Sequence, residues 1–196
     1  MRTFIAIPLP KECQALLGQM QECLRACNAD VRWVAIPSIH LTLKFLGEVD
    51  PAVIPALGTA LTESSGAERS FELRLHGLGC FPHARNPRVV WCGIDGETEN
   101  LLHLQQTVET ACAKFGFAPE ERSFRPHLTL GRVQGRRNIQ PLTERIEAGF
   151  DTSCVFQADR FHVYKSSLKP QGAEYTVVNT IGLNEKRFTG AADHAN

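Results

Sequence analysis

The sequence has no excess charge of either sign and no long uninterrupted apolar run. Its 196 residues carry 21 basic and 21 acidic side chains, so the formal net charge is zero. Without a global basic field, the chain has no general attraction for long nucleic acids, and anion binding has to come from local clustering. A small or terminal anionic substrate fits this balance better than a duplex. The apolar runs fall far short of the ~20 residues that span a bilayer.

Motifs for disulfide chemistry and for common metal sites are also missing. The seven cysteines are odd in number and scattered, and no C-x-x-C, H-x-H or H-E-x-x-H pattern occurs. Cys23, Cys27 and Cys112 fall on apolar helical stripes, which is typical of buried reduced thiols. Pro8 and Pro10 interrupt an N-terminal apolar run that is too short for a secretory signal. We therefore expect a cytoplasmic protein without disulfides, metal ions or other cofactors.

What the sequence does contain is the balance of a globular protein, with 43% hydrophobic and 21% charged residues. Period-two and helical spacings of apolar residues predict an α+β fold. The predicted strands are Thr3–Ile7, Val31–Val34, Leu41–Leu46, Phe71–Phe81, Arg88–Gly93, His127–Leu130, Val155–Tyr164 and Tyr175–Ile181. The predicted helices lie around Leu16–Cys27, Val53–Leu61, Leu101–Phe115 and Ile139–Ile146.

An internal repeat organises these elements. HLTLKF begins at His40 and HLTLGR at His127, an offset of 87 residues (127 − 40). The same offset carries Phe4–Ile7 onto Trp91–Ile94. The order strand, helix, HLTL strand, helix, strand, strand therefore occurs twice without net insertion.

The repeat predicts the architecture. We expect two pseudo-symmetric lobes, each an antiparallel sheet flanked by helices, with a central cleft to which each lobe contributes one HLTL strand. Residues 1–183 would form this single bilobal domain. The polar residues 184–196 are expected to be a frayed tail.

The two motifs supply an acid–base pair and two hydroxyl groups. Alternate residues of a strand face the same side, so His40 points with Thr42, and His127 with Thr129. One imidazole can act as a general base while the other, protonated, acts as a general acid. The threonine hydroxyls can hold a phosphate between the rings for in-line attack at phosphorus. One HLTL alone is more often an ordinary strand, but two copies at equivalent places favour a functional site.

A metal site is the alternative for these motifs. Each His-x-Thr offers one strong ligand per strand, and no carboxylate lies within either motif. We therefore predict a mechanism that needs no metal ion.

The residues around the motifs also match a known family. The matching stretches are FIAIPLP at 4–10, HLTLKFLGEV at 40–49, GLGCFP at 77–82, PRVVWCGI at 87–94, PHLTLGRV at 126–133 and YKSSLKPQGAEY at 164–175. With them the chain resembles the 2H phosphoesterase superfamily, and in particular its RNA 2′,3′-cyclic phosphodiesterase branch, also called 2′-5′ RNA ligase. The resemblance covers nearly the whole chain, up to about Ile181.

The resemblance implies a reaction and assigns roles. The substrate would be a 2′,3′-cyclic phosphate at an RNA or nucleotide end, hydrolysed to a 2′-phosphate, with 2′-5′ ligation as the reverse reaction. His40 would be the proton donor to the leaving 3′-oxygen, and His127 the proton acceptor from water. The residues alone do not decide which histidine is the acid and which is the base, because the motifs are nearly symmetric.

Four further residues are candidates for substrate binding. Strict alternation would bury Arg132 with the leucines, but Gly131 permits a bulge that turns the arginine toward the cleft. Phe45, its counterpart, belongs either to the core or to a base-stacking surface. Phe4 lines the cleft or the core, and Arg125 either reaches RNA phosphates or is solvated.

Two other functions remain open from the sequence. The same chemistry would serve a small cyclic nucleotide or an ADP-ribose cyclic phosphate. A non-enzymatic nucleotide-binding module is the third interpretation, although binding alone would not require an acid–base pair. A monomer is expected in each case.

Overall fold

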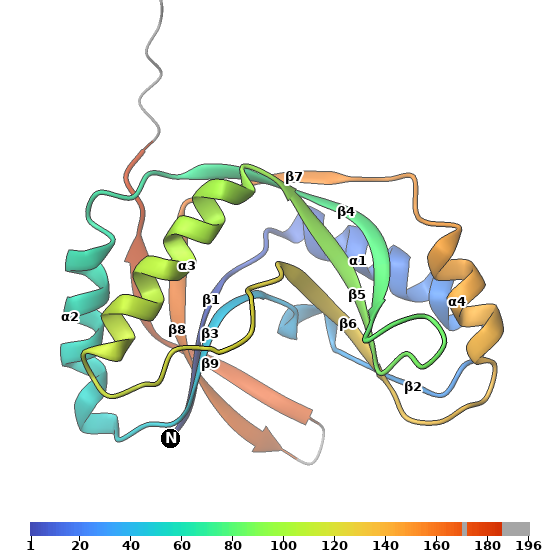
Figure 1. Ribbon diagram of the computed structural model, residues 1–196, viewed down its shortest axis with the longest axis horizontal. Helices are drawn as coiled ribbons and strands as arrows, with labels where there is room; N and C mark the ends of the chain where they lie inside the picture. The colour runs from blue at the N-terminus through green and yellow to red at the C-terminus, as the bar shows by residue number, and fades with distance from the viewer. Residues whose placement is uncertain (170–171, 186–196) are drawn as a thin grey trace, which may run out of the picture.

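The computed structural model describes residues 1–169 and 172–185 (Figure 1). The strands are β1 (Arg2–Ile7), β2 (Val31–Trp33), β3 (Leu41–Glu48), β4 (Phe71–Phe81), β5 (Val89–Gly96), β6 (His127–Val133), β7 (Cys154–Ala158), β8 (Arg160–Lys169) and β9 (Gly172–Gly182). The α-helices are α1 (Lys11–Arg25), α2 (Ile54–Ser64), α3 (Thr98–Ala113) and α4 (Ile139–Glu147), and short 3-10 turns lie at Ile36–Ser38 and Pro51–Val53. No helix in the described ranges is long and apolar enough to cross a membrane.

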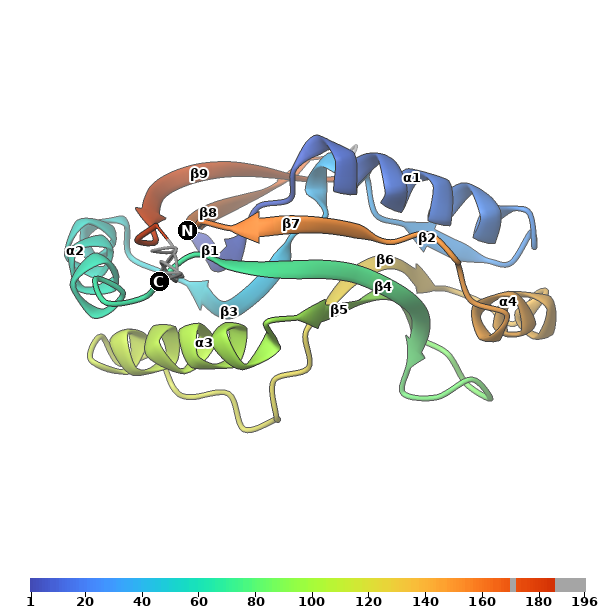
Figure 2. The ribbon, with the colours of Figure 1, turned by 90° about the horizontal axis from the view of Figure 1, so that it is seen from above.

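The described strands form two antiparallel sheets. One has the order β3-β1-β8-β9 and the other the order β2-β6-β5-β4-β7. Helices α2 and α3 lie beside the first sheet, and α1 and α4 beside the second (Figures 1 and 2). The predicted α+β fold with two sheet-and-helix lobes is therefore confirmed.

Each lobe contains strands and helices from both halves of the sequence. Helix α1 follows β1 of the first sheet, but its Gln21 donates hydrogen bonds to the carbonyls of Leu130 in β6 (2.9 Å) and Val34 (2.7 Å), beside the second sheet. Helix α3 follows β5 of the second sheet, but its Glu109 pairs with Lys44 in β3 of the first. The two half-chains therefore exchange their first helices.

The element bounds recur at the 87-residue offset found in the sequence. Shifted by 87, α1 (Lys11–Arg25) falls on 98–112, and α3 spans Thr98–Ala113. In the same way β1 (Arg2–Ile7) falls on 89–94, within β5. The assignment of residues 1–183 to one bilobal domain stays a prediction.

One predicted strand, Val155–Tyr164, is wrong as a single element. Strand β7 ends at Ala158 and pairs with β4, whereas β8 begins at Arg160 and pairs with β1 in the other sheet. The chain changes sheets at Asp159, whose carbonyl accepts a hydrogen bond from the Leu183 amide at 2.8 Å. The buried positions change phase at this residue, from Phe156 and Ala158 before it to Phe161 and Val163 after it, and this shift marks the break that the single predicted strand overlooked.

The predicted start of the tail is also wrong. The Asn184 amide donates to the Glu68 carbonyl at 2.9 Å, and its side-chain nitrogen donates to the Gly66 carbonyl at 2.6 Å. Asn184 is therefore anchored beside the end of α2 rather than frayed. The rest of the predicted tail, from residue 186 onward, lies outside the described residues.

Both HLTL strands carry a bulge directly after the threonine. In β3 the partner of Ala6 is Thr42 and the partner of Ile5 is Lys44, so Leu43 is passed over. In β6 the partners of Trp91 and Val90 are Thr129 and Gly131, so Leu130 is passed over. The bulge predicted at Gly131 is present, and an unpredicted one occupies the same place in β3.

The two bulges accommodate different residues because their neighbours differ. A Cβ at Gly131 would lie 2.6 Å from Val31 Cγ1 and 3.0 Å from Trp33 Cε3, so β2 leaves no room for a side chain. At the equivalent place in β3, Lys44 extends into the protein. Its Nζ lies 2.5 Å from Glu109 Oε2 and donates to the Ala118 carbonyl at 2.9 Å.

We predict that removing one partner of this buried ion pair destabilises the protein. The side chains of Lys44 and Glu109 are only 4% and 15% exposed. Lys44→Met leaves a carboxylate without its cation, so the free energy of unfolding should fall by about 3 kcal/mol. The double variant Lys44→Met/Glu109→Met should lose less than Lys44→Met alone. Urea unfolding measures the stability of Lys44→Met, Glu109→Met and the double variant. If the double variant loses as much stability as the two single variants together, Lys44 and Glu109 do not form a stabilising pair.

Candidate active site

A cleft of about 2390 Å³ lies between the two lobes and contains both motifs. His40 and Thr42 line it from the first sheet, and His127 and Thr129 from the second. Strands β3 and β6, which are far apart in the sequence, thus face one cavity. The structure places the four residues together, as the repeat predicted.

The ring of His40 is enclosed by aromatic side chains from neighbouring strands. Phe4 stacks on it with ring centroids 4.5 Å apart and planes 19° apart. Tyr175 meets it edge-on at 5.1 Å, and Tyr164 lies at 5.6 Å. Such an apolar surrounding disfavours the charged imidazolium. Burial accordingly lowers the pKa of His40 to about 4, although a hydrogen bond to the backbone of Ser38 acts in the opposite direction.

The position of Phe4 differs from the cleft-lining role proposed for it. Its side chain is only 2% exposed and does not line the cleft, because the rings of His40, Tyr164 and Tyr175 surround it. A ring this deeply covered offers no face for a nucleotide base. Phe4 instead stacks on the His40 ring without reaching the cleft.

His127 is held differently. Its Nδ1 lies 2.7 Å from the carbonyl oxygen of Arg125. Because a carbonyl oxygen only accepts, Nδ1 carries the hydrogen, and in the neutral ring Nε2 keeps its lone pair. The ring contacts Phe81 edge-on, with centroids 5.0 Å apart. This tautomer is the one that a general base acting through Nε2 requires.

The two threonines present unused hydroxyl groups. Both side chains are half-buried and line the cleft. Within the part of the chain that the structure describes, neither the Thr42 nor the Thr129 hydroxyl makes a hydrogen bond to protein. Both are therefore available to donate to a bound anion.

The bulges bring the next side chains to the cleft surface. Phe45 is 68% exposed, and both Phe45 and Arg132 line the cleft, since the bulge shifts the alternation by one residue. The alternative that placed Phe45 in the core is therefore wrong. Arg125 is exposed and also lines the cleft. Substrate contacts by these three side chains stay predictions.

Sequence reasoning missed several residues that line the cleft or surround His40. Arg32 lies in β2, which is too short to show a clear alternation, and no partner motif marks it. Tyr164 and Tyr175 fall within a stretch that matches the family, but nothing in one strand reveals that its aromatic residues surround a histidine on another strand. Phe81 also falls within a matching stretch, GLGCFP at 77–82, but its place at the end of a strand does not reveal a contact with His127.

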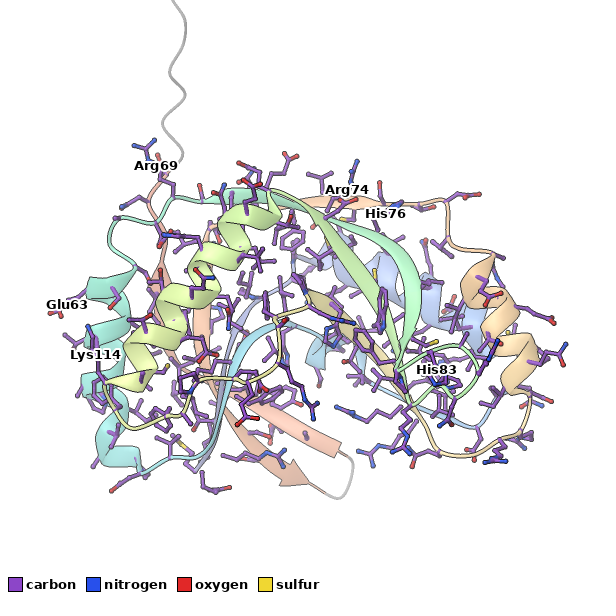
Figure 3. The ribbon with its side chains drawn as sticks, in the orientation of Figure 1. Glu63, Arg69, Arg74, His76, His83 and Lys114 are labelled. Carbon is purple, nitrogen blue, oxygen red and sulfur yellow. The ribbon has the colours of Figure 1, made fainter. Side chains whose placement is uncertain are left out.

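The other histidines of the described ranges, His76, His83, His103 and His162, do not line the cleft. His83, for example, lies in the turn between β4 and β5 (Figure 3). Across residues 1–169 and 172–185, no group of three or more His, Cys, Asp or Glu side chains is placed to hold a metal ion. Metal independence stays a prediction.

Comparisons with known proteins identify related sequences and structures. The sequence matches the family model of the 2′-5′ RNA ligase superfamily over residues 12–170. It is 34% identical over 191 residues to an RNA 2′,3′-cyclic phosphodiesterase of Thermotoga maritima, covering 97% of this chain and 97% of that protein. It is 31% identical over 188 residues to one of Methanothermobacter thermautotrophicus, covering 93% of this chain and 98% of that protein.

Solved structures are similar along almost the whole chain. TT0787 of Thermus thermophilus matches with a TM-score of 0.79 at 26% identity, covering 95% of this chain and 100% of that one. E. coli LigT complexed with 3′-AMP matches with a TM-score of 0.73 at 27% identity, covering 93% of this chain and 97% of that one.

The burial of His40 predicts a pH-dependent stability. Its pKa is about 4 in the folded protein against 6.5 ordinarily, so between these values the unfolded chain binds the proton more tightly. This contribution to stability is fully present above about pH 6.5 and is lost as the pH falls to about 4, a loss of about 3 kcal/mol. His40→Asn should therefore lose less stability than the wild type between pH 7 and pH 4 in urea unfolding. Equal losses of stability in the variant and the wild type would show that His40 is not the source of this pH dependence.

Proposed function

Because this chain belongs to the 2′-5′ RNA ligase superfamily, we propose that it is an RNA 2′,3′-cyclic phosphodiesterase that hydrolyses 2′,3′-cyclic phosphate ends to 2′-phosphates. The observation that carries the proposal is the convergence of His40, Thr42, His127 and Thr129 on one cleft. Relatives named for this activity, at 31% and 34% identity over nearly the full chain, support the substrate class. The reverse reaction would form a 2′-5′ linkage.

The proposed mechanism is an in-line displacement at phosphorus. His127 accepts a proton from water through Nε2, and the water oxygen bonds to phosphorus. The bond from phosphorus to the 3′-oxygen breaks, and His40 donates its proton to that oxygen. The hydroxyls of Thr42 and Thr129 donate to the non-bridging phosphate oxygens and hold them between the rings.

The low pKa of His40 fits this role only together with the substrate. In the empty cleft, burial holds the pKa at about 4, and the ring is neutral at neutral pH. A phosphate anion against the ring favours the charged form and raises this pKa. His40 then takes up its proton as the anion binds. The same buried surroundings favour transfer of this proton to the 3′-oxygen as its bond to phosphorus breaks.

The related structure of E. coli LigT with 3′-AMP favours one alternative. That protein is complexed with a mononucleotide, so a small cyclic nucleotide or an ADP-ribose cyclic phosphate is the second candidate substrate for the same mechanism. A non-enzymatic nucleotide-binding module is the third candidate. The monomeric state and the cytoplasmic location stay predictions.

The proposal is tested by product identification. Purified protein should open adenosine 2′,3′-cyclic phosphate and a short RNA with a cyclic phosphate end, giving the 2′-phosphate, and should do so undiminished in EDTA. Chromatography against 2′- and 3′-phosphate standards distinguishes the isomers. A 3′-phosphate would reverse the roles of the two histidines, and loss in EDTA that one metal restores would overturn the metal-free mechanism.

Substitution of either histidine should abolish turnover without unfolding the protein. We expect kcat for His40→Ala and His127→Ala to fall by at least about 100-fold, because each removes one proton-transfer step. Circular dichroism and urea unfolding show whether the fold is intact. His83→Ala, in the turn between β4 and β5, is the matched control. Near-normal turnover of either active-site variant would rule out the two-histidine mechanism.

A further inference from the structure

Positions of the cleft that correspond at the 87-residue offset differ in charge. Arg32 in β2 and Arg132 in β6 are direct partners in the antiparallel register, and both line the cleft. At the 87-residue offset these positions correspond to Pro119 and Phe45, which also line the cleft. The paired positions are therefore cationic in β2 and β6, whereas their counterparts are apolar, with Glu120 and Glu121 following Pro119 along the cleft.

The pairing of the two arginines carries a cost that the fold does not offset. Like charges directly opposite each other on neighbouring strands repel, and their side chains leave the sheet on the same side. Both side chains are exposed, and neither forms an ion pair within the described residues. The acidic residues that line the cleft are Glu109 in α3, Glu120 and Glu121 in the loop before β6, and Glu174 in β9, so none comes from β2 or β6 themselves. An anion bound between the guanidinium groups would remove the repulsion.

We propose that Arg32 and Arg132 form a second phosphate subsite, which holds the phosphodiester on the 5′ side of the nucleotide whose cyclic phosphate lies between His40 and His127. This inference rests on the proposed function and sharpens it. The preferred substrate is then an oligonucleotide end or a 5′-phosphorylated nucleotide, rather than an unphosphorylated nucleoside cyclic phosphate.

The distance along β6 suits this role. Arg132 is three residues beyond Thr129, which corresponds to roughly 10 Å of strand at about 3.3 Å per residue, less the shortening at the bulge. One nucleotide can span this separation. Guanidinium groups bind phosphate oxygens through two parallel hydrogen bonds, so two arginines side by side can hold a diester from both sides.

The aromatic side chains of the cleft suit the base of the same nucleotide. Phe45 is exposed, and Tyr175 lines the cleft beside His40. Aromatic side chains bind nucleotide bases by stacking with little preference for sequence. The terminal nucleotide would thus have its base on the aromatic side and its 5′-phosphate on the arginine side, with the cyclic phosphate between the histidines.

Equilibrium binding of two product analogues tests the subsite without requiring turnover. Adenosine 2′,5′-bisphosphate should bind the wild-type protein about tenfold or more tighter than adenosine 2′-monophosphate, because only the former has a 5′-phosphate. Arg32→Ala should remove most of this difference, and Arg32→Lys should retain part of it. Calorimetry at fixed ionic strength measures the dissociation constants of both ligands for each protein.

The matched control is Arg69→Ala, which removes the same charge at the outer edge of the molecule, away from the cleft (Figure 3). It should leave the difference between the two ligands unchanged. Equal affinities of both ligands for the wild-type protein would overturn the subsite. So would an Arg32→Ala variant that keeps the full difference, or an equal effect of Arg69→Ala.

Measurements of turnover distinguish a failure of the subsite proposal from a failure of the proposed function. Arg32→Ala should reduce kcat/KM for both a dinucleotide with a 2′,3′-cyclic phosphate end and the nucleoside cyclic phosphate. The reduction for the dinucleotide should be at least about five times larger, because only the dinucleotide has the 5′-side diester. A wild-type protein that hydrolyses neither substrate would refute the proposed function, and the binding experiment would still decide the subsite. Hydrolysis of both with equal losses in the variant would refute the subsite alone.

Discussion

The active cleft depends on one backbone irregularity, the bulge that follows the threonine in each HLTL strand. With regular alternation, Phe45 and Arg132 would share the core face of their strands with the leucines. The bulge instead keeps two consecutive residues inward, Leu43 with Lys44 and Leu130 with Gly131, and returns the next side chain to the cleft. Gln21 and Glu109, which reach across from the exchanged helices, stabilise the irregular backbone at these points.

The near-symmetric scaffold supports two unlike histidines. Each has a hydrogen-bond partner two residues earlier in the chain, at Ser38 and at Arg125. Their surroundings differ, because the first sheet places Phe4, Tyr164 and Tyr175 around His40, whereas Phe81 alone makes a ring contact with His127 within the described residues. Differences in packing around a repeated motif can thus separate an acid from a base.

The sequence predicted the lobes, the motif strands and the four motif residues, because periodicity and repetition are local properties of the chain. It also predicted the bulge at Gly131, since glycine marks such places. It could not predict the bulge at Lys44, where a buried ion pair with Glu109, 65 residues away, replaces the glycine signal. The burial of Phe4 and the pairing of Arg32 with Arg132 likewise depend on contacts between distant strands.

The exchange of helices between the lobes has a consequence for how such a molecule can be divided. A chain cut after the first repeat would separate α1 from β6 and β7, which it contacts through Gln21 and Cys13. The second repeat would likewise lose Lys44 of β3, the partner of Glu109 in α3. Neither half could bury all of its core residues by itself. Two copies of a single repeat could close both cores only by intertwining, so one repeat has the geometry of a subunit in a domain-swapped dimer.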